Sequence, residues 1–520
     1  MPRHRDVPSL ELLSLKSIGC LVVQMAPTIL SKISVYKEPQ KVVSILQKNL
    51  SWLNNHLSSH IPFYLYDQMA MEVLKAVEAL VEETKKSYYP RTSMSRFLTE
   101  MNVAVSLTEV VVNHYLKSVD LSRWPKIMRY LLYKKLHKLT GLENLYIGSC
   151  LGGWRTSEFD RCLLDSISQM KHLKSLCLCF DGTDFTVQTV GENCLQIQCL
   201  DLTSSIAVTD RCIPFLLKCV NLKELQLHRT SVTTEGLAQL IVGLPKLQDL
   251  GRCDDFGNVI KHLHHKYPNE GPFALKKIQT RDITTENLRL LVWMFPKIEY
   301  VSLFHDVQIS DLTVLISLDH LKDLKLLSCA FYSDYLQQLL EIRGTNITSL
   351  HLEHVEELDF KVLVDISQYC PKLKNLVCYN CDFRNSPIPN QKFKVHPFLN
   401  LERIFWVVDS AVSHLEFILN HAYHIKYIHL GSSNGITHSS IVNILTVNSM
   451  KKLEELRVLY SSDMNMRTVE LLLASCTNLK VLSELESWQG ININELETFK
   501  KYIITNNFDL DIRPTLSFTI

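Results

Sequence analysis

The chain has 520 residues, of which 46% are apolar and 21% charged, so it can bury a large core and wholesale disorder is not expected. Its 55 basic residues nearly balance 54 acidic ones, a formal net charge of +1. This balance gives no overall electrostatic attraction for nucleic acid or an anionic membrane. We therefore expect neither as a partner, although a local charged patch remains open.

Cysteine usage indicates the compartment. The 15 cysteines are odd in number and lie mostly inside apolar segments. The opening MPRHRDVPSLELL lacks the apolar run and cleavage site of a signal peptide, and no stretch approaches the ~18 consecutive apolar residues of a membrane span. We expect free thiols in a reducing compartment, and hence a cytoplasmic or nuclear protein.

Residues 1–135 predict a helical domain. The segments SLELLSLKSIGCLVVQMAPTIL, PQKVVSILQKNLSWLNNHL and FYLYDQMAMEVLKAVEALVEETKK each have the pattern of an amphipathic or buried helix. Breaks are expected at Pro27, Pro39 and Pro62. The least that such a domain does is to cap whatever follows it.

A short pattern, L-x-x-L-x-L-x-x-C/N, then recurs along the chain. Clear copies are LENLYIGSC, NLKELQLHRT, LKDLKLLSC, ITSLHLEHV, LKNLVCYNC, IKYIHLGSS and LEELRVLYS. With weaker copies the mean period is about 26 residues, within the range of leucine-rich repeats. The fourteen copies begin at Leu142, Leu173, Ile197, Leu222, Leu247, Leu275, Ile298, Leu321, Ile347, Leu373, Leu401, Ile425, Leu453 and Leu479.

Each copy predicts one strand–loop–helix unit. The second and third apolar positions, such as Leu225 and Leu227, alternate inward on a short strand, and a segment of helical period separates successive copies. One unit cannot bury its apolar face alone, so neighbours must stack. We predict an α/β leucine-rich-repeat solenoid, a horseshoe, over residues 136–490, with residues 491–520 as a C-terminal cap or tail.

Four cysteines carry a family resemblance. Cys194, Cys219, Cys370 and Cys476 each lie three residues before the first apolar position of a repeat. Segments such as VTDRCIPFLLKCVNLKELQL resemble the cysteine-containing repeat of F-box/LRR proteins and their relatives. The resemblance covers roughly residues 140–490 and implies a non-catalytic protein that binds other proteins.

The N-terminal region resembles adaptor-binding elements of cullin–RING ubiquitin ligases. Ser14-Leu15 followed by Cys20-Leu21 is similar to the BC box that binds elongin C, but with one extra residue between the anchors. On a helix this rotates the anchors by about 100° relative to each other. A second register, from Ser9-Leu10, keeps the spacing but has serine in place of the cysteine.

HIPFYLYDQMAMEVL resembles either the cullin-contact segment that follows such boxes or the start of an F-box, which would bind Skp1. A BC box followed by leucine-rich repeats is the order found in Zyg-11/Zer-1 receptors. The resemblance implies a substrate receptor, whereas the alternative is an interaction scaffold or inhibitor whose N-terminal helices are only a cap. The implied adaptor-binding residues are Leu10, Leu15, Cys20, Leu21, Pro62 and Leu65.

Signals for enzymatic chemistry are weak. The phosphate-binding, nucleophile-elbow and HExxH motifs do not occur in the sequence. The repeat register places Cys378 and Cys381 inside the core, and Cys177 and Cys179 on the outward face of one strand, as a reactive pair or as small filler. The cluster HLHHKYPNEG reads as a solvated loop. We expect no catalytic residue, no cofactor and no metal.

The register also predicts a binding surface. Residues between the apolar positions of each strand point away from the core, toward the concave face of the horseshoe. Aromatic residues and arginines, which dominate interface energetics, recur at these positions. We expect a protein substrate to contact Tyr300, Phe304, Lys325, His351, Glu353, Tyr379, Arg403, Phe405, Tyr427, His429 and Arg457.

Overall fold

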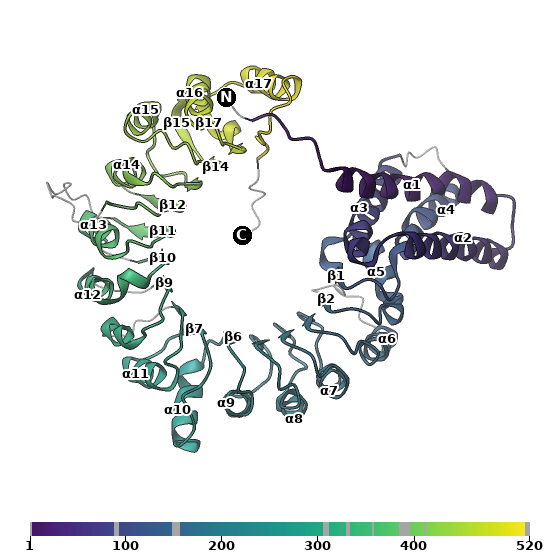
Figure 1. The fold of residues 1–520 in the computed structure, drawn as a ribbon, viewed down its shortest axis with the longest axis horizontal. Coiled ribbons are helices and arrows are strands. Elements are labelled where there is room, and N and C mark those ends of the chain that lie inside the picture. The colour runs from purple at the N-terminus through teal and green to yellow at the C-terminus, as the bar shows by residue number, and fades with distance from the viewer. Residues whose placement is uncertain are drawn as a thin grey trace. The chain divides into compact units, whose positions relative to one another are not determined.

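The computed structural model describes residues 3–87, 93–147, 157–304, 311–328, 333–355, 358–383, 396–409 and 412–514 (Figure 1). The chain forms two compact units. The first unit is Pro8–Gly251, and the second unit is Arg252–Ile520 together with Met1–Val7.

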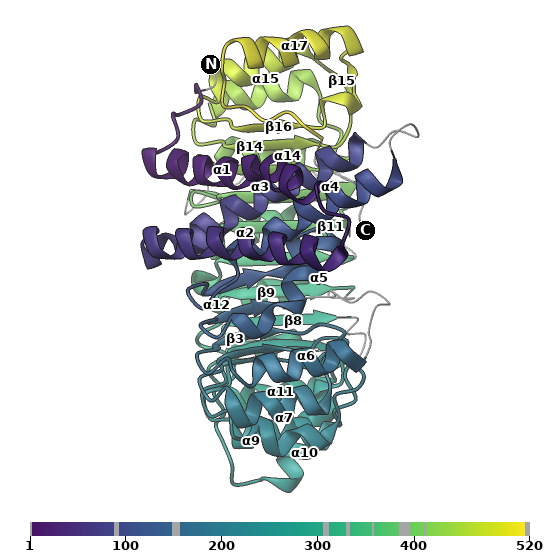
Figure 2. The same cartoon turned by 90° about the vertical axis from the view of Figure 1, so that its right-hand side faces the viewer.

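The first unit begins with a group of packed helices. Ser9 caps the first of them, because its side chain accepts a hydrogen bond from the backbone N–H of Leu12. The longest helices are α1, α2 and α3, and α1 packs against both of the others (Figure 2). The α-helices of this part are α1 (Leu10–Ile33), α2 (Pro39–His60), α3 (Tyr66–Lys86), α4 (Met94–Ser106) and α5 (Lys126–Lys134), with a 3-10 turn at Phe63–Leu65.

Helix α1 does not break where the sequence predicted. Pro27 lies inside α1, which continues to Ile33. The break expected at Pro27 is therefore wrong. Pro27 lies on the exposed side of the helix, while Val22, Ala26 and Ile29 hold the opposite side in the core and keep the helix continuous.

Six parallel strands follow in the first unit, each paired with the next in chain order. Helices or turns connect them, and the last strand ends at Arg252, where the second unit begins. The strands are β1 (Ser118–Asp120), β2 (Asn144–Tyr146), β3 (Ser175–Cys177), β4 (Cys199–Asp201), β5 (Glu224–Gln226) and β6 (Asp249–Arg252), and the helices between them are α6 (Ser157–Ile167), α7 (Asp184–Asn193), α8 (Ile213–Leu216) and α9 (Thr234–Gly243).

The second unit continues the same strand–helix alternation. Its paired parallel strands are β7 (Lys277–Arg281), β8 (Tyr300–Phe304), β9 (Asp323–Leu327), β10 (Ser349–Glu353), β11 (Asn375–Asp382), β12 (Arg403–Asp409), β13 (Tyr427–Leu430), β14 (Glu455–Val458) and β16 (Val481–Ser483). A small separate pair is β15 (Ser461–Asn465) with β17 (Trp488–Gly490). Its helices lie on one side of its strands (Figure 1) and are α10 (Phe256–Lys266), α11 (Thr285–Met294), α12 (Ser333–Arg343), α13 (Phe360–Tyr369), α14 (Val412–His421), α15 (His438–Val447), α16 (Met466–Ser475) and α17 (Ile493–Thr505).

The predicted repeat register is confirmed. Each of the fourteen predicted starts lies two residues before a strand, from Leu142 before β2 to Leu479 before β16. Leu225 and Leu350, both at the second apolar position, are fully buried. Parallel strands with buried leucines and helices on one face are the architecture that the sequence predicted.

The sheet begins one repeat earlier than predicted. Leu116, Val119 and Leu121 are buried in the repeat spacing around β1, whose three residues pair with β2. The boundary at residue 135 is therefore wrong, since one strand of the sheet lies within the range expected to be only helical. A single copy with valine in place of the central leucine gave too weak a periodic signal.

The four recurring cysteines each accept, through the backbone carbonyl, a hydrogen bond in the turn that precedes a strand. The backbone N–H of Leu373 donates to the Cys370 carbonyl at 3.0 Å, and that of Leu479 donates to the Cys476 carbonyl at 3.1 Å. The thiols themselves are buried in the core. A small apolar side chain is therefore needed here, because a helix ends and the chain turns into the next strand.

The C-terminal segment adds one more strand-like connection. The backbone N–H of Leu482 donates to the Asp511 carbonyl at 2.9 Å, and the Asp511 N–H donates to the Lys480 carbonyl at 2.7 Å. Within the same unit the His4 and Phe508 rings stack at 5.1 Å. Asp511 therefore continues the parallel ladder by one bridge beyond β16.

Helix α1 is also long and apolar enough, by length and composition alone, to cross a membrane over a window of 18 residues. Only 28% of that window is buried inside the protein. The sequence reading did not anticipate this helix as a candidate span. Its buried face packs on α3, where Gly19 leaves no room for a side chain because a Cβ there would lie 2.8 Å from the Glu72 carbonyl oxygen.

Replacing a buried leucine at the second apolar position of a repeat should destabilise the fold strongly. We expect Leu350→Ala to lower the free energy of unfolding by about 2–5 kcal/mol, because it leaves a cavity in the densely packed core. Ile206→Ala, at a side chain that is 75% exposed, should change it by less than about 0.5 kcal/mol. Denaturant unfolding followed by circular dichroism measures both, and equal stabilities would contradict the assigned register.

Candidate functional site

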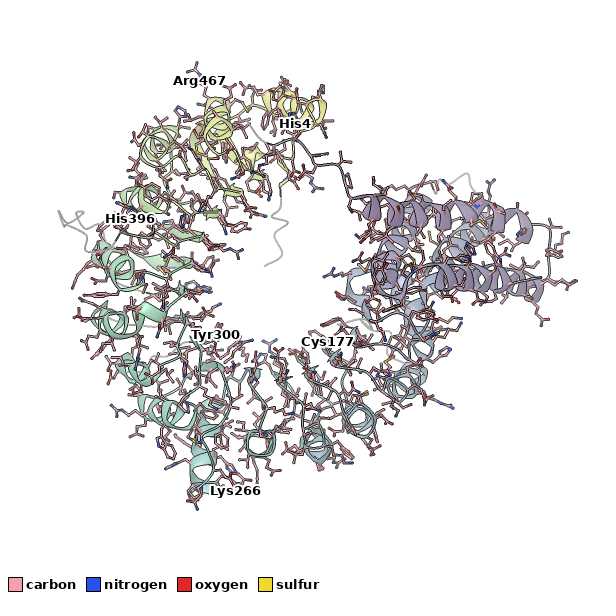
Figure 3. All side chains as sticks on the ribbon, viewed as in Figure 1. His4, Cys177, Lys266, Tyr300, His396 and Arg467 are labelled. Atoms are coloured by element: carbon pink, nitrogen blue, oxygen red, sulfur yellow. The ribbon has the colours of Figure 1, made fainter. Side chains whose placement is uncertain are left out.

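The eleven residues predicted to bind a partner all lie on strands of the second unit with their side chains turned away from the helices. On β13, Tyr427 and His429 point outward and are partly exposed, whereas Ile428 and Leu430 are buried. Figure 3 places Tyr300 on the strand side of this unit and Lys266, at the end of α10, on its helix side. We call the surface formed by these eleven residues the open face.

Strand pairing arranges the open face in rows. His351 is paired with Lys325 on one side and with Val377 on the other. Phe405 follows in the same row, and then His429 and Arg457. Neighbouring parallel strands lie about 4.8 Å apart, so the side chains of one row touch their neighbours. Residues more than one hundred positions apart in sequence thus form one continuous strip.

Aromatic side chains of this strip and of the rows on either side of it form the centre of the open face. The Phe405 and His429 rings stack with centroids 4.4 Å apart, and Tyr379 lies at a centroid distance of 6.2 Å from Phe405. The Arg403 guanidinium lies over the Tyr427 ring at 4.8 Å. These contacts hold large, partly exposed rings in fixed positions, so that a partner would lose little side-chain entropy on binding to them.

Charged groups flank the aromatic centre. The Nε2 atom of His351 lies 3.1 Å from Oε2 of Glu353, and Nε of Arg457 donates to Oε1 of Glu455 at 2.5 Å. Glu455 is a neighbour that the sequence reading did not include. The register could have identified Glu455, because Glu455 and Arg457 are both outward positions of β14.

The two histidines of the open face are held neutral. Burial lowers the pKa of His429 below its usual value, and the nearby Arg457 lowers it further. Burial likewise lowers the pKa of His351, with the positive charge of Lys325 as the second cause. At pH 7 the positive charge of the open face therefore comes from its lysine and arginines.

The first residues of the second unit extend this surface. The Arg252 guanidinium lies over the Phe304 ring at 4.7 Å, and its Nε donates to Oδ1 of Asp254 at 2.6 Å. Sequence reasoning missed Arg252 because it occupies the third apolar position of the repeat that begins at Leu247, a position expected to face the core. The arginine itself, at a position where other copies have an apolar residue, was the available signal, and Gly251 before it has left-handed backbone.

The six predicted adaptor-binding residues do not all share one surface. Leu10 is 80% exposed and Leu21 is 61% exposed, and Cys20 is exposed as well. Leu15, in contrast, is only 5% exposed and faces the helical core. In the turn before α3, Pro62 is exposed and Leu65 is half-buried. The structure thus separates Leu15 from the other anchor positions on α1.

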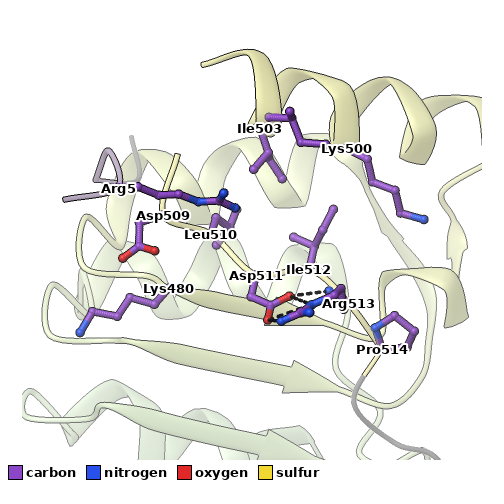
Figure 4. A pocket seen from close by; sticks show the side chains of 11 residues that line it. Arg5, Lys480, Lys500, Ile503, Asp509, Leu510, Asp511, Ile512, Arg513 and Pro514 are labelled. Carbon is purple, nitrogen blue, oxygen red and sulfur yellow. Dashed lines mark hydrogen bonds and ion pairs between the residues drawn. The ribbon is translucent and has the colours of Figure 1, made fainter. Parts of the chain in front are cut away.

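A surface pocket of about 620 Å³ lies beside the C-terminal connection of the second unit (Figure 4). Arg5, Lys480, Lys500 and Asp511 are among its lining residues. Much of its charge is already paired, because Arg513 forms a 2.6 Å ion pair with Asp511 and Lys480 forms a 2.8 Å ion pair with Glu454. These pairs stabilise the cap and give the pocket little net charge to attract an ionic ligand.

Two other groups noted in the sequence have structural roles. Cys378 and Cys381 are buried, as the register predicted, and burial raises the pKa of Cys381 to about 11. His264 and His265 lie in the last turn of α10 rather than in a loop, so the loop assignment is wrong. The positive charge of Lys266, in the same turn, complements the carbonyl end of that helix.

Neither a family model nor a curated protein matches the chain. Solved structures do match: a leucine-rich-repeat protein of Leptospira interrogans, at 15% identity and a TM-score of 0.37, with coverage of 77% of this chain and 95% of that one. An internalin of Listeria monocytogenes matches at 14% identity and a TM-score of 0.38, covering 68% and 89%. The yeast complex of Rad7 and Elc1 gives 11% identity and a TM-score of 0.42, covering 87% and 94%.

The fold is a leucine-rich-repeat fold. This conclusion follows from the chain's own strand register, in which buried leucines recur at fixed positions of successive parallel strands.

The lowered histidine pKa values predict a stability that depends on pH. A folded-state pKa below the unfolded value of about 6.5 means that the unfolded chain binds more protons as the pH falls. The stabilising contribution of neutral His429 is complete above about pH 6.5 and is lost progressively below it. Denaturation midpoints between pH 8 and pH 5 should fall more steeply for wild type than for His429→Asn. Parallel pH profiles would show that His429 is not held neutral.

Proposed function

We propose that this chain is a non-catalytic subunit that binds another protein through the open face of its second unit. The observation that carries the proposal is the fixed, partly exposed cluster of Tyr379, Phe405 and Tyr427, with Arg403 placed over Tyr427. Tyrosine and arginine side chains dominate binding energy at protein interfaces. A strip that crosses several strands is suited to an extended protein surface rather than to an enclosed small molecule.

The first test removes the centre of the open face. Phe405→Ala combined with Tyr427→Ala should weaken capture of the native partner by about tenfold or more, because each ring is a candidate anchor. Quantitative mass spectrometry of material bound to the tagged full-length chain gives the measurement. Trp293→Ala is the control, since Trp293 is a large aromatic residue that is 61% exposed on helix α11, outside the open face. Retention of every partner by the double variant would refute the open face as the binding site.

We further propose that α1 attaches this subunit to a ubiquitin-ligase adaptor. Leu10, Leu13, Ser14, Ser17 and Leu21 are all exposed. Their spacing of three, one, three and four residues places them along one side of the helix. An exposed apolar stripe flanked by small serines is suited to packing against a partner's apolar groove.

The burial of Leu15 affects both BC-box registers, but it removes the leading leucine of only one of them. Leu15 and Cys20 are five residues apart, which places them about 140° apart around a helix. Leu15 already packs in the core, so the Ser14-Leu15 register cannot present both anchors to elongin C. The register from Ser9-Leu10 also contains Leu15, directly after Ser14, but it has Leu10 and Ser14 on the exposed stripe, and we assign the adaptor contact to these two exposed positions.

In this arrangement the chain does no bond chemistry. The adaptor and a cullin would bring the ligase machinery to α1, while the open face holds the substrate. The resulting rate increase comes from proximity, because a lysine of the bound substrate is kept near the reactive ubiquitin thioester.

The second test addresses the adaptor. Full-length chain carrying Leu10→Asp and Leu21→Asp should lose elongin C in a pull-down blotted for elongin C, Skp1 and cullins, because the charges prevent burial of the stripe. Ser31→Asp, on an exposed position of the same helix, is the matched control and should bind as wild type does. Capture of neither adaptor by wild type would refute the receptor proposal, and capture of Skp1 would replace elongin C with the F-box interpretation.

One observation favours the simpler alternative of a scaffold without a ligase. The buried residues of α1, including Leu15, Val22 and Ile29, pack inside the helical part of the first unit, as they must in any cap. A pull-down in which wild type binds a substrate but no adaptor or cullin would support this alternative. The open-face proposal would be unaffected by that result.

A further inference from the structure

Three potential metal ligands meet on adjacent strands of the first unit. Cys177 is the last residue of β3 and is paired with Asp201 on β4, and Cys179 lies two residues after the end of β3. The two Sγ atoms are 3.4 Å apart. Oδ2 of Asp201 lies 3.6 Å from Sγ of Cys177 and 3.2 Å from Sγ of Cys179.

These separations match the edges of a tetrahedral zinc site. With Zn–S bonds of about 2.3 Å and Zn–O bonds of about 2.0 Å, tetrahedral geometry requires S···S and S···O separations of roughly 3.8 and 3.5 Å. The observed distances differ from these values by a few tenths of an ångström, which small side-chain rotations can supply. One ion can therefore contact all three atoms without movement of the backbone.

The cluster is also prepared for a cation. Oδ1 of Asp201 accepts a hydrogen bond from the Thr203 N–H at 2.9 Å, which orients the carboxylate and leaves Oδ2 toward the thiols. The hydrogen bond from the Cys179 thiol lowers the pKa of Cys177, and the same interaction raises the pKa of Cys179. Hydrogen bonds among the two thiols and the Asp201 carboxylate thus already hold the three groups around the position that a metal ion would take.

Packing alone does not explain these two cysteines. The turn cysteines Cys194, Cys219, Cys370 and Cys476 are buried and fill the core, whereas Cys177 and Cys179 are partly exposed on the strand face. Cysteines that only filled space in the core would not require a carboxylate within hydrogen-bond distance of both thiols. Thiolates select zinc and other soft or borderline ions over magnesium and calcium.

We propose that Cys177, Cys179 and Asp201 bind a zinc ion through three protein ligands and leave its fourth position open. Binding converts two thiols to thiolates and releases their two protons, with no change of oxidation state. The open position is available to water or to a side chain of a protein bound at this face. This site is independent of the proposed function, since the ion binds the chain alone.

Cobalt(II) is the probe for this site, because tetrahedral thiolate coordination gives it near-ultraviolet charge-transfer absorption and intense visible bands. Titration of the reduced full-length chain should give these bands with one ion per chain, and zinc should displace the cobalt. Affinity should fall steeply, by about tenfold or more per pH unit below pH 7, because protons compete for the sulfurs.

Variants identify the ligands. Cys177→Ser and Cys179→Ser should each remove most of the charge-transfer absorption, and Asp201→Asn should weaken binding by about ten- to a hundredfold. Cys199→Ser is the matched control, because Cys199 is a partly exposed thiol on the adjacent strand outside the cluster. Circular dichroism confirms that each variant is folded, and Asp201→Asn keeps the size of the side chain it replaces.

Two results would overturn the assignment. One is a wild-type chain that shows no thiolate-to-cobalt absorption at equimolar cobalt. The other is absorption that persists in Cys177→Ser and disappears in Cys199→Ser, which would place the metal at a different thiol set.

Discussion

The structure depends on one constraint: a single repeat cannot bury its own leucines. Each strand has only a few residues, and its second apolar side chain, such as Leu225 or Leu350, is buried only when the strands on both sides are present. Backbone hydrogen bonds tie each repeat to the one before it, as where the Tyr427 N–H donates to the Glu402 carbonyl at 3.0 Å. Stability is therefore a sum of nearest-neighbour interfaces, and both ends need caps.

The same constraint creates the candidate sites. Successive side chains of a strand point to opposite faces, so the residues next to each buried leucine point away from the core. Where parallel strands pair in register, equivalent outward residues of neighbouring repeats lie side by side. Phe405 and His429 meet in this way, and so do Cys177 and Asp201. The fold supplies the geometry, and the outward residues are free to vary in chemistry.

Much of the fold could be predicted from the sequence because the leucine spacing repeats often enough to average out weak copies. The outward direction of the open-face residues follows from the same register. Three features could not be predicted because tertiary packing determines them. Strand β1 has Val119 rather than leucine at its centre, and Pro27 lies within a helix that packing keeps continuous. The orientation of Leu15 depends on how α1 packs on α3. The left-handed residues that end the strands, such as Phe180 and Arg229, are not glycines and gave no signal.

Hydrogen exchange of the backbone amides tests the central claim most directly. If nearest-neighbour stacking holds the chain together, the slowest amides should recur with a period of about 26 residues, at the start of every strand and including the β1–β2 pair. Protection concentrated in the helices, with strand amides exchanging at the rates of an open chain, would contradict the stacked ladder and every site derived from it.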